Sequence, residues 1–153
     1  MKKYELTAEF IEKWGKKLFR IKALISFGSV EAGELGGYVE KEDNLAQDGN
    51  AWVYGNARVC GDAEVYGNAD YLLIGRIGSR FSFTTFFKNK DQGITVSCGC
   101  FLGTIAEFRA KVTDTHGNNK HAKMYNLAAD MAELQILGEE HFDKLNTNKS
   151  EPF

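Results

Sequence analysis

The densest group of polar side chains that could bind a ligand lies between residues 78 and 88. It begins with Gly78-Ser79-Arg80 at a predicted turn and continues along a predicted strand. A guanidinium is a planar fork of donors, and hydroxyl and backbone N–H groups add more, so this composition is typical of an anion site. The simpler interpretation is that these hydroxyls lie on the solvent face of a sheet. The predicted ligand contacts, with aromatic rings for a base, are Ser79, Arg80, Thr84, Thr85, Phe86, Lys88 and Phe101.

A second group combines thiols with imidazoles. Cys98-Gly99-Cys100 is followed by His116 and His121. The histidine spacing is in the range found in zinc fingers, but the two cysteines are closer than a finger's cysteine pair. We therefore expect metal-free thiols and no cofactor. A nucleophilic cysteine with a histidine base is the alternative, and any chemical role of these four side chains stays open.

These groups must be positioned by a chain whose centre is a six-residue repeat. Residues 50–67 read NAWVYG-NARVCG-DAEVYG, with alanine at 51, 57 and 63, valine at 53, 59 and 65, and glycine at 55, 61 and 67. This period predicts a parallel β-coil of short strands and corners, similar to the left-handed hexapeptide β-helix. Because strand residues alternate, alanine and valine should face inward, and Trp52, Arg58 and Glu64 outward. Tyr54, Cys60 and Tyr66 depart from the usual repeat.

Several aromatic residues are predicted on or near the outside of this coil: Trp52, Tyr54, Tyr66 and Tyr71. They could stack on a base or form a subunit interface. Three hexads make about one coil, so the interface is favoured, as a closed dimer or trimer. Hexapeptide acyltransferases place a catalytic histidine between adjacent coils. The first histidine here is His116, well after the repeat, which argues against acyl transfer and predicts a protein without catalytic residues.

The flanking segments predict an α+β fold, mainly β. A hairpin is expected around Trp14-Gly15. An apolar run predicts a strand at 70–77, and alternation predicts strands at 81–88 and 94–98. Thr104 and Glu107 form a capping box for a first helix that ends at 116–118. A second helix is expected over 119–137, with one apolar stripe formed by Met124, Leu127, Met131 and Leu134.

The predicted organisation is one domain over residues 1–137. It contains an N-terminal hairpin and entry loop (1–37), the hexapeptide coil (38–73), antiparallel strands that cap it (74–103) and two helices (104–137). A loose tail is expected over 138–153, which holds the one proline of the chain.

Composition limits the class of protein. The chain has 153 residues, 43% of them hydrophobic, and a net charge of −2, so neither bulk nucleic acid nor a membrane is an expected partner. The N-terminus lacks the apolar core of a signal peptide. The odd number of cysteines, three, favours reduced thiols and a location in the cytoplasm.

Several short stretches together resemble small accessory proteins of phages and prophages. In those proteins a variable number of Gly-Asn-Ala-x-Val-Tyr hexads lies between constant ends. The matching stretches cover most of residues 18–135 and are Leu35-Gly-Gly-Tyr-Val-Glu, Ala51-Trp-Val-Tyr-Gly-Asn-Ala-Arg-Val, Gly78-Ser-Arg, Thr84-Thr-Phe, Cys98-Gly-Cys-Phe and Glu107-Phe. The resemblance brings no established activity.

Small phage accessory proteins often counteract host defence. The resemblance therefore implies a protein of the host cytoplasm that sequesters a small anionic immune signal, such as a cyclic nucleotide or an ADP-ribose derivative. Sequestration needs tight binding rather than catalysis, which agrees with the lack of a convincing acid–base pair. The alternatives are a protein-binding inhibitor of a host defence complex and a structural repeat module that oligomerises.

Overall fold

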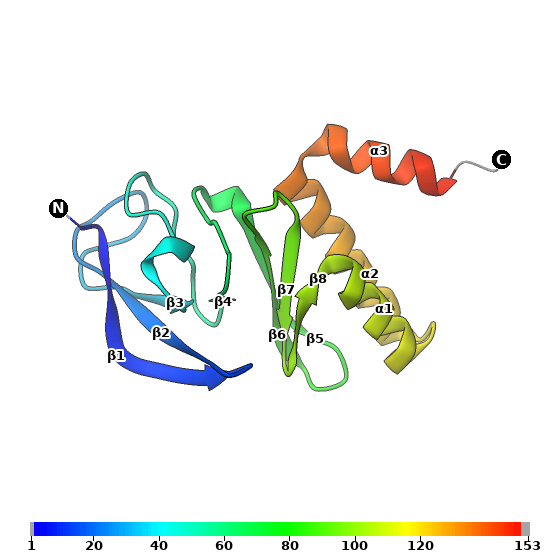
Figure 1. Cartoon of the computed structure of the whole chain (residues 1–153), viewed down its shortest axis with the longest axis horizontal. Coiled ribbons are helices and arrows are strands. Elements are labelled where there is room, and N and C mark those ends of the chain that lie inside the picture. Colours follow the sequence, from blue (N-terminus) through cyan, green and yellow to red (C-terminus); the bar gives the residue numbers. More distant parts are fainter. Residues whose placement is uncertain (1, 151–153) are drawn as a thin grey trace.

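The computed structural model describes residues 2–150, and the side chains of residues 2–145. Two four-stranded sheets and three α-helices follow one another along the long axis of the molecule (Figure 1). The N-terminal sheet and the hexads lie at one end, the second sheet lies in the middle, and the helices cover its far side. The fold is therefore mixed α+β, and its strands contain more residues than its α-helices.

The first sheet has the strand order β1-β2-β3-β4. Its strands are β1 (Tyr4–Lys13), β2 (Lys16–Ala23), β3 (Leu35–Val39) and the two-residue β4 (Arg58–Val59). The predicted N-terminal hairpin is confirmed, since β1 and β2 pair antiparallel with Lys13 opposite Lys16. Trp14 and Gly15 both have positive φ, 55° and 71°, so the two-residue connection has the φ signs of a type I′ turn.

The hexads bury the residues that the six-residue period selects. All three alanines and all three valines of the repeat are at most 2% exposed. Val59 pairs in parallel with Val39, and Val65 forms a parallel bridge with Leu45. These contacts establish parallel neighbours about 20 residues apart, although they do not by themselves make a regular β-helical spindle.

Trp52 corrects the predicted outer face of the repeat. Its side chain is fully buried rather than exposed, with ring centroids 6.3 Å from Tyr4 and 5.4 Å from Phe27. The N-terminal hairpin and the loop after it cover this part of the outer face. A Cβ on Gly36 would lie 2.7 Å from Trp52 Cζ2, so the indole also requires a glycine beside it.

The second sheet is antiparallel and has the order β5-β6-β7-β8, which confirms the predicted antiparallel strands. It consists of β5 (Tyr71–Ile77), β6 (Ser82–Lys88), β7 (Ile94–Cys98) and β8 (Phe101–Thr104). Both faces of this sheet are covered. Phe87 packs into the core formed with the hexads, and Phe86 packs into a second core formed with the helices.

Two helices pack on the second sheet. In α1 (Ile105–His116) the capping box is present: Thr104 Oγ1 accepts from the backbone N–H of Glu107 at 3.2 Å, and the Thr104 N–H donates to Glu107 Oε1 at 2.8 Å. The second helix, α2 (Lys120–Ala132), continues into a π-helical turn, η3 (Glu133–Leu137).

The face of α2 that packs inward differs from the apolar stripe in the sequence. Alanines are buried instead, and small side chains bring the helix close to its neighbours. Leu127, Met131 and Leu134 are 66%, 51% and 43% exposed. An apolar stripe on this helix is therefore open to solvent.

The segment predicted as a loose tail contains a third helix, α3 (Glu139–Ser150), and residues 151–153 lie outside the described range. Gly138, with φ of 93°, separates it from η3. Figure 1 shows α3 projecting away from the sheets. Within residues 2–150, no helix is both long and apolar enough to cross a bilayer.

Candidate functional site

The predicted anion site is divided by the second sheet. Ser79 and Arg80 lie exposed in the turn between β5 and β6. Thr84, Thr85 and Phe86 are at most 2% exposed; Thr84 and Phe86 face the helix side of the sheet, whereas Thr85 lies in the wall of a cavity described below. The physical reason is that β6 is covered on both faces. Strand alternation sends neighbouring side chains into different cores, where neither face is open to solvent.

The other predicted contacts lie elsewhere. Lys88 is at the opposite end of β6 from Arg80, with its Nζ atom 4.0 Å from Asp70 Oδ1. Phe101 packs against the helix-facing core, with its ring tilted relative to that of Phe108 and the two centroids 5.7 Å apart. The seven predicted residues therefore do not form one pocket.

A different cavity lies where the hexads meet the second sheet. It has a volume of about 170 Å³, and its wall comes from the β1–β2 turn, from the hexads, and from β6 and β7. We name it the Arg58 cavity. The lining residues that matter for its chemistry are Trp14, Asn56, Arg58, Ser82, Phe83 and Ser97.

The backbone of Arg58 is fixed on both sides of its peptide unit. Its N–H donates to Thr85 Oγ1 at 3.1 Å, and its carbonyl accepts from Ser97 Oγ at 3.0 Å. These bonds attach β4 to β6 and β7 of the second sheet. Thr85 is therefore a structural acceptor that orients the wall of the cavity, rather than a direct phosphate contact.

The guanidinium of Arg58 has no partner within the described residues. By contrast, Arg20 pairs with Glu9 at 3.0 Å and Arg109 pairs with Asp130 at 2.7 Å. An arginine that is half-buried in a cavity wall and lacks a carboxylate keeps its five N–H donors available for a bound anion.

Trp14 adds a second unused donor. Its Nε1 atom is buried and has no hydrogen-bond partner among the described residues. Its backbone is in the left-handed region, which is uncommon for a bulky residue and marks a position worth explaining. Trp14 lines the cavity, and an indole has both an N–H donor and a flat aromatic face.

Sequence reasoning missed both Arg58 and Trp14. The sequence predicts that Arg58 points outward from its hexad and that Trp14 lies in a turn. Nothing in the sequence indicated that the second sheet would close over them. The cavity exists only because two segments, 14–58 and 82–99, meet in the fold.

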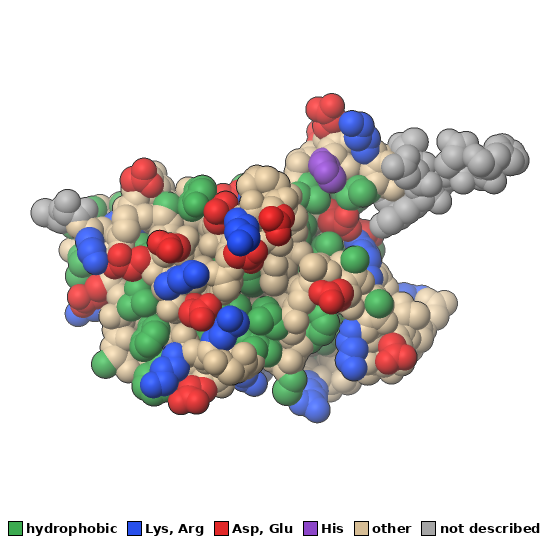
Figure 2. Space-filling view, viewed as in Figure 1, with side chains coloured by type: hydrophobic (Ala, Val, Ile, Leu, Met, Phe, Trp, Pro, Cys, Tyr) green, Lys and Arg blue, Asp and Glu red, His purple; other side chains and the backbone are tan. Residues whose placement is uncertain are grey.

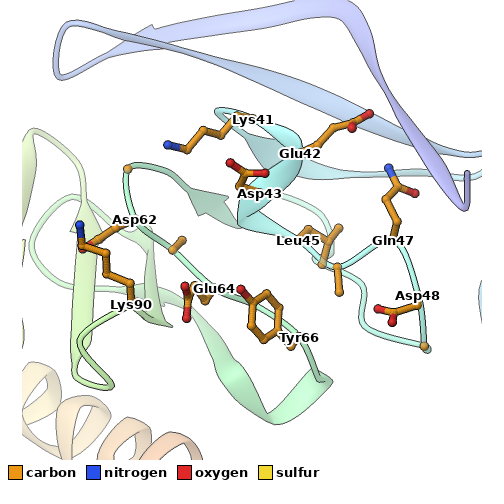
Figure 3. Close-up of a pocket in the computed structure, with 14 residues that line it drawn as sticks. Lys41, Glu42, Asp43, Leu45, Gln47, Asp48, Asp62, Glu64, Tyr66 and Lys90 are labelled. Atoms are coloured by element: carbon orange, nitrogen blue, oxygen red, sulfur yellow. The ribbon is translucent and has the colours of Figure 1, made fainter.

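A larger hollow of about 990 Å³ lies on another side of the hexads (Figure 3). It lies between residues 41–49 and 61–66, with Lys90 at one side. Five carboxylates and two ammonium groups line it, so its net negative field repels an anionic ligand. The carboxylates belong to Glu42, Asp43, Asp48, Asp62 and Glu64.

The thiols and imidazoles do not gather into a metal site. Cys98 Sγ accepts a hydrogen bond from Thr84 Oγ1 at 3.1 Å, and Cys100 is exposed. His116 stacks on Tyr125, with ring centroids 5.9 Å apart. Residues 2–150 hold no group of three or more histidine, cysteine or acidic side chains arranged to bind a metal ion.

Exposed aromatic rings of the repeat are fewer than predicted. Tyr54 is 43% and Tyr66 58% exposed, whereas Tyr71 and Trp52 are buried. Burial raises the pKa of Tyr71 to about 12, and its hydroxyl accepts from the Tyr54 N–H at 3.3 Å. On the face shown in Figure 2, acidic and basic side chains are interspersed, without a broad basic surface.

No protein-family model matches the chain. It is 40% identical, over 62 residues, to YdcK of Escherichia coli (strain K12), which is described as an uncharacterized acetyltransferase. The similarity covers 35% of this chain and 19% of YdcK, so the chain spans about a fifth of the length of that relative. This match gives limited support to the hexapeptide-repeat interpretation, and it places no activity on the chain.

Proposed function

We propose that the chain is a non-catalytic binding protein that sequesters a small anionic, nucleotide-type molecule in the Arg58 cavity. The observation that carries this proposal is the pairing of an unpartnered guanidinium with an unpartnered buried indole N–H in one cavity. A buried donor without a partner is costly, and a bound anion would give the buried indole N–H an acceptor and the half-buried guanidinium a counter-charge.

The rest of the lining supports an anionic, partly aromatic ligand. Ser82 contributes a hydroxyl and Asn56 contributes an amide, whereas the Ser97 hydroxyl already donates to the Arg58 carbonyl. The rings of Trp14 and Phe83 can contact a base or sugar. The acidic hollow lies elsewhere, so the anion and the carboxylates do not compete for one site.

The same lining argues for binding without chemistry. It contains no carboxylate and no imidazole, as far as the described residues show, so the usual acid–base groups are missing beside the ligand. Cys98 is its one thiol, and it already accepts a hydrogen bond from Thr84. Binding without turnover is what a sequestering protein requires.

The biological role that we propose is counteraction of a host defence signal in the host cytoplasm. It rests on the resemblance to phage accessory proteins and on the binding site above. We also infer that the hexads form a short left-handed coil that supports the wall of the cavity at Arg58.

A second candidate is binding to a protein, including a second copy of the chain. The exposed stripe of Leu127, Met131 and Leu134 on α2 and η3 favours it. Light scattering on the purified protein measures whether copies associate, and titration with host complexes measures other partners.

Ligand depletion tests the main proposal. The protein is mixed with cyclic oligonucleotides, ADP-ribose derivatives and acetyl-CoA, then filtered, and the filtrate is analysed by chromatography. The bound fraction is heated to release its contents. We expect one nucleotide to disappear from the filtrate and to return intact.

Two charge-matched variants locate the site. Arg58→Ala should abolish depletion, whereas Lys88→Ala removes the same charge at a distant, ion-paired position and should retain it. Quenching of Trp14 fluorescence by the ligand, absent in Trp14→Phe, reports occupancy directly. Depletion that survives in Arg58→Ala would place the site elsewhere, and a ligand that returns altered would establish an enzyme.

A further inference from the structure

The arginines of the chain divide into two groups. Of the five, Arg20 and Arg109 form ion pairs that join neighbouring elements. The other three, Arg58, Arg76 and Arg80, have no acidic partner within the described residues. Arginines that only improve solubility need not lie near one another. The positions of these three are therefore relevant to ligand binding.

All three belong to segments that meet at the Arg58 cavity: β4 carries Arg58, and the β5–β6 hairpin carries Arg76 and Arg80. Ile77 pairs with Ser82, and Ser82 lines the cavity. Arg76, the second-last residue of β5, and Arg80, in the β5–β6 turn, are therefore each within two residues of this pair. In Figure 1 this turn and the β1–β2 turn, which carries Trp14 to the cavity, both lie at the lower edge of the molecule.

The β5–β6 turn is held in a defined conformation. Gly78 has φ of 84°, and a Cβ at this position would overlap the hydroxyl of Tyr125 on α2. The Phe81 N–H donates to the Gly78 carbonyl at 3.1 Å and closes the turn. The turn is therefore fixed against the helix layer rather than free to move.

Phe81 combines an unfavourable backbone conformation with an exposed ring that a ligand could contact. Its backbone has φ of 51°, and its ring is 72% exposed. A left-handed conformation is unfavourable for phenylalanine, and an exposed ring gains little packing in return. The ring is therefore free to contact a ligand beside Arg80.

The volume of the cavity limits what it can enclose. It measures about 170 Å³, the space of about six water molecules at ~30 Å³ each. Sites that enclose drug-sized molecules are roughly 300–1,000 Å³. The cavity can thus take one phosphate with part of a sugar or base, and the remainder of a nucleotide must extend beyond its rim.

We propose that the ligand is a nucleotide with at least two phosphate groups, bound in two subsites. This inference rests on the proposed function. One phosphate binds Arg58 inside the cavity. The second lies outside, between Arg76 and Arg80, and a base stacks on the exposed ring of Phe81. A nucleotide with one phosphate can fill the first subsite alone.

Calorimetric titration with AMP, ADP-ribose and cyclic di-AMP tests the second subsite. We expect the wild type to bind one of the two-phosphate probes at least tenfold more tightly than AMP. Arg80→Ala should weaken binding of that probe by roughly ten- to a hundredfold, the usual effect of losing a charge-assisted contact, and leave AMP binding unchanged. Phe81→Ser should also weaken the two-phosphate probe selectively.

Arg58→Ala should weaken AMP and the two-phosphate probes alike, and Lys88→Ala should weaken neither. Equal losses for AMP and the two-phosphate probes in Arg80→Ala would show a general charge effect and overturn the two-subsite inference alone. AMP binding that matches or exceeds that of both two-phosphate probes would do the same. A wild type that binds none of the probes would overturn the proposed function and the inference with it.

Discussion

Truncation of Trp52 measures whether the outer face of the hexads is covered. The sequence places this residue on the solvent side of the repeat, where substitutions usually change the free energy of unfolding by no more than about 0.5 kcal/mol. In the structure its side chain is fully buried and makes edge-to-face contacts with Tyr4 and Phe27. The two interpretations therefore predict very different costs for Trp52→Ala.

The structure predicts a loss of about 4 kcal/mol. Truncating a buried tryptophan to alanine costs about 3–5 kcal/mol, a range that includes the loss of its ring contacts. For a chain of 153 residues, 1 kcal/mol corresponds to about 2–4 °C in melting temperature, so a fall of about 8–16 °C is expected. Trp52→Phe should cost much less, because it also removes the unpartnered Nε1–H of the buried indole.

Urea unfolding followed by circular dichroism gives the free energy, and thermal unfolding gives the midpoint. Tyr66→Ala is the control, since this aromatic residue of the same repeat is 58% exposed and should change stability little. A Trp52→Ala protein that unfolds within about 0.5 kcal/mol of the wild type would refute the burial of the indole. It would also refute the packing of the N-terminal hairpin on the hexads.

Two further predictions concern titratable groups. Hydrogen bonds at the start of α1 hold the pKa of Glu107 below its usual value, so its contribution to stability is present above the unfolded-state pKa and is lost as pH falls through the folded-state pKa. The stability difference between the wild type and Glu107→Gln, measured by urea unfolding, should therefore shrink as the pH falls below the ordinary carboxyl pKa of about 4, and a constant difference would contradict this. Burial raises the pKa of Cys60 to about 11, whereas Cys100 is exposed. Iodoacetamide at neutral pH, followed by mass spectrometry, should modify Cys100 first and Cys60 only on unfolding, and equal rates would contradict the burial.

The periodic patterns of the sequence predicted which side chains share a face. The hexads bury their alanines and valines, β7 directs Ile94 and Val96 to one core, and Thr104 with Glu107 begins α1. These features succeed because they depend on the alternation of a strand or on hydrogen bonds within one turn of a helix. Both are local, so residues close in sequence contain the information.

Which elements pack on each face of a strand or helix depends on segments that are far apart in sequence. Thr84 and Thr85 were expected to meet a ligand because their hydroxyls follow Gly78-Ser79-Arg80, yet Thr84 is buried against the helix side and Thr85 orients Arg58 in the cavity wall. The alanine face of α2, rather than its apolar stripe, packs inward for the same reason. Alternation identifies two faces but cannot tell how many layers will pack on them.

The sequence by itself determined the six-residue repeat, the two hairpin-forming regions and the first two helices, since each follows from short-range spacing. Tertiary structure alone decided that Trp52 is buried and that Arg58 and Trp14 share a cavity. The cavity arises where the β1–β2 turn and the hexads meet the second sheet, and no periodic pattern in the sequence predicts that contact. Its position, and the unpaired state of its arginine, are properties of how the layers pack.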